Sequence, residues 1–248
     1  MATHTHPQII MVSDLHFGAD YPKAAPDREK KFCRFLESLP AHAEELWILG
    51  DLFEFWMEYQ KVIPKSHFGV LHGLRKLVER GMRVHYLSGN HDFNLGRFFE
   101  QELGLHVHDG PVTATLQGRH CLLLHGDGLA ESDRLYRLTK WIMRHPWSNR
   151  AFQWFHPDLG IGLARHLSGL SRDKHDNRPR FMDEYEKAAI KLLGQGHEIV
   201  VHGHTHCGFV KEVPGGLWVN SGEWLQRLEY LVMSQGAFEL KTYPDGGP

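Results

Sequence analysis

Predominantly apolar runs of strand length recur along the chain, and each one ends in polar residues. They span 8–12 (QIIMV), 45–49 (ELWIL), 83–87 (RVHYL) and 198–202 (EIVVH). Runs of this length and composition predict β-strands that are buried inside a sheet. The sequence therefore predicts core strands that are spread over most of the chain.

Helical patterns separate these runs. Residues 27–39 have apolar positions at helical spacing, and Pro40 ends the pattern. Residues 67–79 place leucine and valine on one face and are closed by Gly81, and residues 95–103 predict a short helix. Strands that alternate with helices in this way predict α/β layers.

The second half of the chain has a different pattern. A hairpin is predicted at 111–125, where two apolar runs flank Gln117 and Gly118. Residues 131–193 show a mostly helical pattern, and 208–243 predicts consecutive antiparallel strands. The breaks in the helical stretch are Pro146, Pro157 and Gly160. The whole pattern predicts an α/β protein with mixed sheets.

The composition is typical of a soluble globular protein. Of the 248 residues, 42% are hydrophobic and 23% charged, which suits one large domain or a domain with an insertion. With a net charge of −2, the protein as a whole does not attract the negatively charged backbone of nucleic acid, so we expect no nucleic-acid partner. No apolar run approaches the ~18 residues that a membrane-spanning helix needs.

The cysteines and the first residues indicate the compartment. Cys33, Cys121 and Cys207 are odd in number and widely spaced, so they predict reduced thiols rather than a disulfide framework. The first residues lack the basic and long apolar regions of a secretory signal. We therefore expect a cytoplasmic protein. Whether Cys207 is reactive or packed stays open.

Polar side chains follow the predicted strands in a repeated way. The chain contains 20 histidines, and histidine is the commonest metal ligand. Several of them follow strands together with carboxylate and amide side chains. The segments are 13–18 (SDLHFG), 50–56 (GDLFEFW), 89–93 (GNHDF), 122–127 (LLLHGD) and 202–206 (HGHTH). Because ligand sites of open α/β sheets lie beyond the carboxyl ends of strands, we expect these turns to converge.

The candidate ligands favour a metal site when they are considered together. Alone, an aspartate after a strand is usually a turn former, and a single histidine is usually exposed. Five strand ends with the same chemistry favour a shared site over five separate explanations. Asp14 and His16 are two residues apart, as are His204 and His206, so an extended backbone would aim each pair at one side. The candidates are Asp14, His16, Asp51, Asn90, His91, His125, His204 and His206.

The ligand types narrow the choice of metal. A mixture of imidazole, carboxylate and amide oxygen, with no cysteine required, suits Mn²⁺, Fe²⁺ or Zn²⁺. A ligand set of this size is too large for one ion but suits two ions that share a bridging carboxylate. Two ions about 3.5–4 Å apart can clamp a phosphoryl group and activate water for in-line attack.

In this order, the motifs D-x-H, GD, GNHD, HGD and GHTH resemble those of the calcineurin-like metallophosphoesterase family. The match covers residues 14–206, which is most of the chain. The resemblance implies an α/β fold, an αββα sandwich of two mixed sheets flanked by helices. It also implies a metal-dependent hydrolase with its site at the strand ends, in a single domain over 1–248.

The resemblance implies a role for each candidate. The ligands implied for the first ion are Asp14, His16, Asp51 and His206. Those implied for the second ion are Asp51, Asn90, His125 and His204, so that Asp51 is the bridge. His91 matches the position beside the leaving-group oxygen, where it acts as an acid or stabilises charge. Asp92 would orient His91 or the turn. Mn²⁺ is the expected metal.

Further motifs resemble a narrower group, the UDP-2,3-diacylglucosamine hydrolases of lipid A biosynthesis. They are LGDLFEFWMEY at 49–59, GNHDFNLGRFF at 89–99 and HGDGLAESDRLYR at 125–137. The implied reaction is attack at the α-phosphorus of the UDP-linked diacylated sugar, which gives UMP and 2,3-diacylglucosamine 1-phosphate. Some members of the group carry arginine, a bidentate diphosphate ligand, where this chain has His91.

Residues 131–182 predict a helical cap insertion that is rich in aromatic residues and arginines. The segment resembles the cap of these hydrolases, which encloses acyl chains beside the metal site. The alternative is a helical pair that packs on the sheet. Its arginines can meet phosphate, and its aromatic surface can rest peripherally on the inner membrane. The positions that match substrate contacts are Asp133, Tyr136, Arg165, Ser168 and Arg172.

Two other functions stay open at this point. One is a metallophosphoesterase that acts on another phosphodiester, of nucleotide, phospholipid or phosphoprotein type, although the apolar insertion argues against it. The other is a scaffold that binds partners without catalysis, which would not need every ligand found here. The aromatic residues within 53–56 are either substrate contacts or core. No obligate protein partner is implied.

Overall fold

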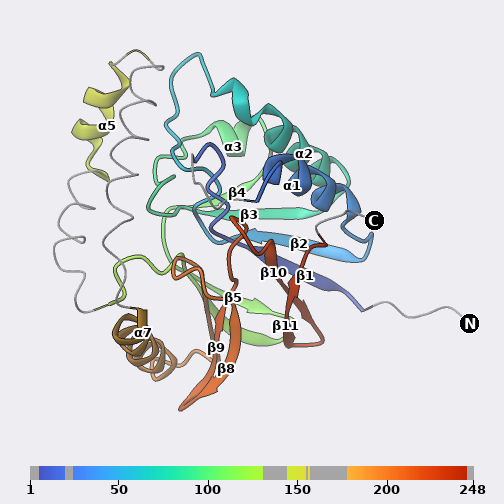
Figure 1. Ribbon diagram of the computed structural model, residues 1–248, viewed down its shortest axis with the longest axis vertical. Helices are drawn as coiled ribbons and strands as arrows, with labels where there is room; N and C mark the ends of the chain where they lie inside the picture. Colours follow the sequence, from blue (N-terminus) through green and yellow to red (C-terminus); the bar gives the residue numbers. More distant parts are fainter. Residues whose placement is uncertain (1–5, 20–24, 131–143, 155, 157–177, 245–248) are drawn as a thin grey trace, which may run out of the picture.

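The computed structural model describes residues 6–19, 25–130, 144–154, 156 and 178–244. In this part of the chain two β-sheets lie face to face, and helices cover their outer faces (Figure 1). The order of layers is helix, sheet, sheet, helix. This arrangement confirms the αββα sandwich expected from the sequence.

The first sheet contains six strands in the order β11-β10-β1-β2-β3-β4. The strands are β1 (Gln8–Val12), β2 (Ala43–Ile48), β3 (Arg83–Leu87), β4 (His106–His108), β10 (Glu229–Ser234) and β11 (Ala237–Thr242). Strands β1 to β4 pair in parallel, so their carboxyl ends lie at the same edge of the sheet. Strands β10 and β11 extend the sheet antiparallel on the other side of β1.

The second sheet contains five strands in the order β5-β6-β7-β9-β8. The strands are β5 (Val112–Leu116), β6 (Arg119–Leu123), β7 (Ile199–His202), β8 (Phe209–Val213) and β9 (Gly216–Asn220). Strands β6, β7 and β9 are parallel, and β5 and β8 add an antiparallel partner at each edge. The carboxyl ends of β6 and β7 therefore lie together, as those of β1 to β4 do.

The helices cover the two outer faces unequally. The described helices are α1 (Arg28–Ser38), η1 (Lys65–His67), α2 (Phe68–Glu79), α3 (Phe98–Gln101), α5 (Pro146–Gln153) and α7 (Arg178–Leu193). Helices α1, α2 and α3 lie on the first sheet, and α7 lies on the second (Figure 1). The α2 face that is buried consists of Val70, Leu71, Leu74 and Leu77, as the leucine spacing predicted.

Alternation along the strands separates the core into layers. In β1, Ile10 and Val12 pack in the cluster that contains α1 and α2, whereas Met11 packs in the layer between the sheets. On the far side, Tyr185 of α7 packs near Trp218 of β9. The rigid parallel strands thus hold their polar carboxyl ends on a well-packed support.

Most predicted elements agree with the structure within about two residues. The runs at 8–12 and 83–87 coincide with β1 and β3. The antiparallel strands predicted within 208–243 are present as two pairs, β8 with β9 and β10 with β11, but the two pairs do not form one continuous series. Strands β8 and β9 join the second sheet, whereas β10 and β11 join the first, because β9 pairs with β7 and β10 pairs with β1. Strand β4, with three residues, was not predicted.

Of the predicted insertion, 131–182, the structure describes residues 144–154, residue 156 and the start of α7. Helix α5 begins at Pro146, where the helical pattern was expected to break, since proline suits the first turn of a helix. Within the described ranges, no helix is both long and apolar enough to cross a bilayer. Cys33, Cys121 and Cys207 are free thiols, with Cys121 buried and the other two partly exposed.

Candidate metal centre

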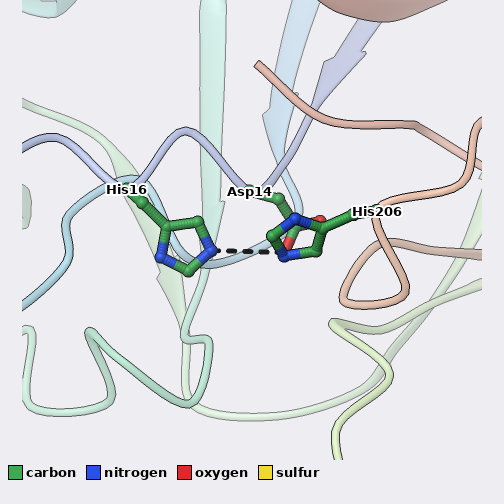
Figure 2. Close-up of side chains that lie close together, drawn as sticks. All are labelled: Asp14, His16 and His206. Atoms are coloured by element: carbon green, nitrogen blue, oxygen red, sulfur yellow. Dashed lines mark ion pairs between the residues drawn. The ribbon is translucent and has the colours of Figure 1, made fainter. Parts of the chain in front are cut away.

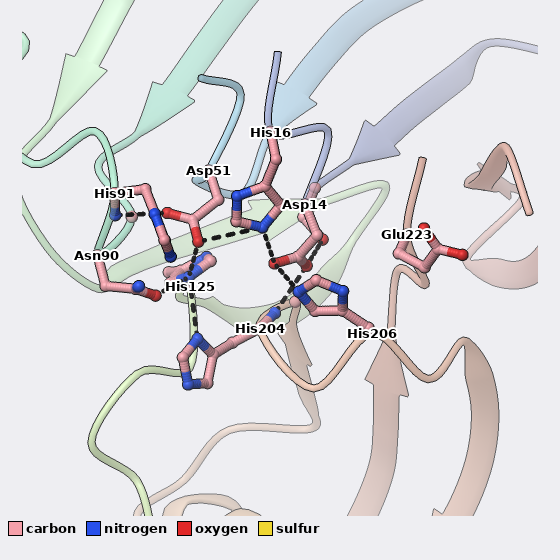
Figure 3. Close-up of polar contacts among 12 residues, drawn as sticks. Asp14, His16, Asp51, Asn90, His91, His125, His204, His206 and Glu223 are labelled. Atoms are coloured by element: carbon pink, nitrogen blue, oxygen red, sulfur yellow. Dashed lines mark hydrogen bonds and ion pairs between the residues drawn. The ribbon is translucent and has the colours of Figure 1, made fainter. Parts of the chain in front are cut away.

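Side chains from five strand ends meet at the junction of the two sheets (Figure 3). They follow β1, β2 and β3 of the first sheet and β6 and β7 of the second. The residues just beyond these strands are Asp14, Asp51, Asn90, His125 and His204. The predicted convergence of the turns is therefore present in the fold. It arises because the parallel strands of both sheets end at this edge.

Asp14, His16 and His206 form a first cluster (Figure 2). Their nearest ligand atoms all lie within 4.8 Å of one another. His206 Nε2 is 3.4 Å and His16 Nε2 is 3.8 Å from Asp14 Oδ1. Asp14 and His16 are buried, whereas the His206 side chain is 39% exposed, so the cluster opens toward solvent on the His206 side.

Asp51, His125 and His204 form a second cluster beside the first. His125 Nε2 is 3.3 Å from Asp51 Oδ2 and 3.3 Å from His204 Nδ1. Asn90 Oδ1 lies 2.9 Å from the same His125 nitrogen. Asp51 Oδ2 is also 3.6 Å from His16 Nε2, so its carboxylate lies between the two clusters. This is the position that a bridging ligand requires.

Two buried polar atoms at the centre fit a cation. Among the described residues, Asp14 Oδ1 and His16 Nε2 are buried and make no hydrogen bond. Buried polar atoms are almost always paired, and these two face each other across a distance that is too long for a hydrogen bond. Their other polar atoms are occupied: Asp14 Oδ2 accepts from Ser13 Oγ at 2.5 Å, and His16 Nδ1 lies 3.1 Å from Glu54 Oε2. A divalent ion would satisfy both free atoms.

The electrostatics of the site also favour a cation. Burial would lower the pKa of His16, but Asp14 and Glu54 raise it to about 10. Burial likewise opposes the charged form of His125, yet Asp51 raises the pKa of His125 to about 10. Burial opposes ionisation of Asp51, and His125 nevertheless holds the pKa of that carboxyl below its usual range. The buried carboxylates therefore stay ionised and favour positive charge beside them.

Comparison with known proteins agrees with this geometry. The family model of the calcineurin-like phosphoesterases matches residues 7–208. The chain belongs to the calcineurin-like phosphoesterase family. A UDP-2,3-diacylglucosamine hydrolase of Tolumonas auensis is 30% identical over 242 residues, covering 95% of this chain and 96% of that one. A UDP-2,3-diacylglucosamine hydrolase of Aeromonas salmonicida is 29% identical over 247 residues, covering 96% and 95%.

Because the chain belongs to this family, it is a metal-dependent hydrolase. The His/Asp clusters described above are candidate sites for the divalent ions of the family. The third cluster consists of His16, Asp51 and His91. His91 therefore lies close enough to be a ligand, although we predicted a different role for it. Its backbone N–H donates to Asp51 Oδ1 at 2.9 Å, which ties the 89–92 turn to the shared carboxylate.

Glu54 is a site residue that the sequence-based prediction missed. Its buried carboxylate lies 3.1 Å from His16 Nδ1 through Oε2 and 3.5 Å from His91 Nδ1 through Oε1. His91 Nδ1 also lies 3.1 Å from the Glu54 carbonyl oxygen. Both contacts engage Nδ1 and leave Nε2 of each ring for the centre of the site. The only sequence signal was its place three residues after Asp51, within an aromatic run.

Asp92 organises the turn rather than the His91 ring. Its carboxylate accepts backbone N–H groups from Asp51 at 3.1 Å, Leu52 at 2.7 Å and Gly89 at 2.9 Å. It also accepts the Tyr86 hydroxyl. Burial raises the pKa of Asp92 to about 6. Of the two roles predicted for Asp92, the contacts support orientation of the turn that follows β3 against the loop that follows β2.

The backbone at the ligands differs from the sequence-based expectation. We predicted that an extended backbone would aim each pair of ligands at one side, and this was wrong. Asp14, His16, His204 and His206 all have left-handed backbone, with φ of 55°, 47°, 65° and 55°. Asp51 does too, with φ of 54°. Such angles are strained for residues with a Cβ and persist where surrounding contacts impose them, often at functional sites.

Glycines let the two loops approach closely. A Cβ at Gly89 would lie 2.0 Å from Asp51 Oδ1, so the Gly89 backbone touches the shared carboxylate. A Cβ at Gly50 would lie 2.5 Å from His125 Nδ1, and Gly50 has a φ of +90°. Both positions exclude any larger residue. The glycines of the GD and GN dipeptides therefore meet a packing requirement beside the candidate ligands Asp51 and Asn90.

The aromatic run beside Asp51 belongs mainly to the core. Phe53 and Trp56 are buried, as one of the two alternatives predicted. Phe55 instead packs against Phe152 of α5, with ring centroids 5.4 Å apart. The predicted substrate contacts lie outside the described residues; they are Asp133, Tyr136, Arg165, Ser168 and Arg172.

Proposed function

We propose that this phosphoesterase hydrolyses the diphosphate of UDP-2,3-diacylglucosamine to UMP and 2,3-diacylglucosamine 1-phosphate, a step of lipid A biosynthesis. The observation that carries the proposal is the end-to-end match to hydrolases of that name, which covers about 95% of both chains. Two ions held by the buried His/Asp clusters would supply the required chemistry. The complete ligand set argues against a scaffold without catalysis.

We assign the metal ligands as the sequence predicted. The first ion would be held by Asp14, His16, Asp51 and His206, and the second by Asp51, Asn90, His125 and His204. Ions bound there would activate water and neutralise phosphate charge. Mn²⁺ is our proposed metal, from a donor set that Fe²⁺ and Zn²⁺ also accept.

His91 would act on the leaving group. Its side chain is 18% exposed, whereas those of His16 and His125 are almost fully buried, so His91 can reach a bound substrate. Glu54 engages Nδ1 and would raise the basicity of the ring. We propose that His91 donates a hydrogen bond or a proton from Nε2 to the departing phosphate oxygen.

The insertion at 131–182 would form the acyl-binding cap of this single domain. Asp133, Tyr136, Arg165, Ser168 and Arg172 are the proposed substrate contacts. Trp147 of α5 is 77% exposed, and Trp154, the residue that caps the C-terminus of α5, is 88% exposed. Exposed tryptophan prefers the interface between lipid and water, so we propose that α5 rests on the inner membrane, where a diacylated substrate resides.

The test is product release from the proposed substrate. Mn²⁺-loaded protein is incubated with UDP-2,3-diacylglucosamine in mild detergent, and UMP is measured. We expect rapid UMP release, no turnover by Asp51→Ala, and a rate lower by about 10²–10⁴-fold in His91→Ala. Robust cleavage of bis(p-nitrophenyl) phosphate without UMP release would contradict the proposed substrate and keep the hydrolase. Full activity of Asp51→Ala would contradict the metal assignment.

A further inference from the structure

Arg144 connects the insertion to the turn that carries the site. Its guanidinium donates from Nη2 to the Gly89 carbonyl at 3.0 Å and from Nη1 to the Asp109 carbonyl at 3.1 Å. Its Cζ also lies over the ring of Phe93, 5.7 Å from the centroid. One planar group thus contacts the turn after β3 at two points and the loop after β4 at a third.

The Gly89 carbonyl is a sensitive place for such a contact. The carbonyl belongs to the peptide that joins Gly89 to Asn90, and the Gly89 backbone touches the Asp51 carboxylate. Next along the turn, the His91 N–H donates to Asp51 Oδ1 at 2.9 Å. A shift of this peptide would therefore move Asn90, His91 and their contact with Asp51 together.

The loop after β4 is attached to the same turn. The Ser88 N–H donates to the His108 carbonyl at 2.9 Å, one residue before Asp109. Arg144 therefore links the turn after β3 to the loop after β4, two segments that the β3–β4 pairing already holds side by side. On the inner side of the turn, Asp92 accepts from the Gly89 N–H at 2.9 Å. The N–H of Gly89 is therefore bonded to Asp92, and its carbonyl is bonded to Arg144.

Helix α5, which begins two residues after Arg144, is also attached to the loop after β2. Gln153 Nε2 donates to the Glu58 carbonyl at 2.9 Å, and Phe152 packs on Phe55. The described residues 144–154 of the insertion thus contact the loop that carries Glu54 and the turn that carries His91. The insertion is a support for the site in addition to any contact with substrate.

We propose that Arg144 is a positioning residue for phosphoester hydrolysis, which holds Asn90 and His91 in place through the Gly89 carbonyl. The inference rests on the proposed function only in that the chain hydrolyses phosphoesters. It differs from a role in gripping the lipid substrate, because a positioning residue must affect every substrate. Misplacement of catalytic groups by about 1 Å can cost ~10²-fold in rate.

The experiment uses bis(p-nitrophenyl) phosphate, which has no acyl chain for the cap to hold. The Mn²⁺-loaded full chain is compared with Arg144→Ala, Arg144→Lys and the control Arg150→Ala, an exposed arginine on the adjoining helix α5. We expect Arg144→Ala to lower kcat by about 10–100-fold with little change in KM and unchanged bound Mn²⁺. Millimolar guanidinium should restore part of the kcat of Arg144→Ala. Arg150→Ala should match the wild type.

Wild-type kcat in Arg144→Ala, with a loss confined to UDP-2,3-diacylglucosamine, would overturn the proposal and make Arg144 a substrate or cap residue. Failure of the wild type to release UMP, with intact cleavage of the small diester, would contradict only the proposed substrate. If Arg144→Ala does not fold, Arg144→Lys decides. The lysine keeps the charge but cannot donate to both carbonyls in a planar fork, so its kcat should also fall.

Discussion

At the scale of single residues, Glu54 contacts two imidazole rings of the site from outside the proposed ligand set. One buried carboxylate faces Nδ1 of His16, a proposed ligand, and Nδ1 of His91, the proposed leaving-group residue. A carboxylate in this place orients an imidazole and increases its basicity, and loss of such a partner typically weakens metal affinity 10–100-fold. Glu54 therefore connects metal binding to the chemistry of the leaving group.

We predict that Glu54→Gln, which keeps the shape and removes the charge, weakens Mn²⁺ binding at the His16 site by about 10–100-fold. Chelator-competition titration measures this affinity. The matched control is Glu58→Gln on the same loop, whose carboxylate instead accepts the Phe98 N–H at 2.8 Å. That change should reduce stability but leave Mn²⁺ affinity unaltered. Equal affinities in wild type and Glu54→Gln would show that the contact is only structural.

Residue identity predicted the candidate ligands that the fold brings together but not how the backbone presents them. Asp14, His16 and Asp51 were recognisable because their side chains suit metal binding and follow apolar runs. Their left-handed φ angles were not, because such angles are imposed by contacts between loops that are distant in sequence, such as Leu15 N–H to the Asp51 carbonyl at 2.9 Å. Glu54 was missed for the same reason, since its partners His16 and His91 are brought to it by the fold.

At the scale of elements, α5 carries large apolar side chains that do not pack against the described residues of the protein. Phe152 packs inward on Phe55, whereas Trp147 and Trp154 are largely exposed. Burial of a large apolar side chain contributes about 1.5–3 kcal/mol, so two tryptophans in a lipid interface can stabilise attachment substantially. The orientation of α5 thus matches the proposed peripheral position.

We predict that the double variant Trp147→Ser and Trp154→Ser weakens binding to vesicles of phosphatidylethanolamine and phosphatidylglycerol by at least about tenfold, a difference of ~1.4 kcal/mol. Cosedimentation of the protein with the vesicles measures the effect. Val210→Ser on β8, far from α5 in Figure 1, is the control for loss of an exposed apolar side chain. Unchanged cosedimentation of the double variant would exclude α5 as the membrane contact.

Element boundaries were predictable where local pattern decides them. The apolar runs of β1 and β3 and the leucine face of α2 need no long-range information. Sheet membership of the last four strands does need it, because Ile10 pairs with Val232 across the whole chain. Strand β4 has three residues, two of them histidine, and forms only because Ser88 and β3 offer it a partner.

At the scale of the whole molecule, the metal centre depends on both sheets. Asp14 and Asp51 come from the first sheet, and His125 and His204 come from the second. A dinuclear site therefore requires the sandwich to be intact, and bound ions would in turn stabilise the contact between the sheets. We propose that these strand ends hold two ions through a shared Asp51 carboxylate.

The most direct test counts Mn²⁺ per chain after gel filtration, by elemental analysis. We predict two ions in the wild type, two in His91→Ala, and loss of both in Asp51→Ala, because removal of a bridging ligand weakens both positions. A wild-type chain that retains a single ion, or Asp51→Ala protein that retains both, would contradict a dinuclear site centred on Asp51.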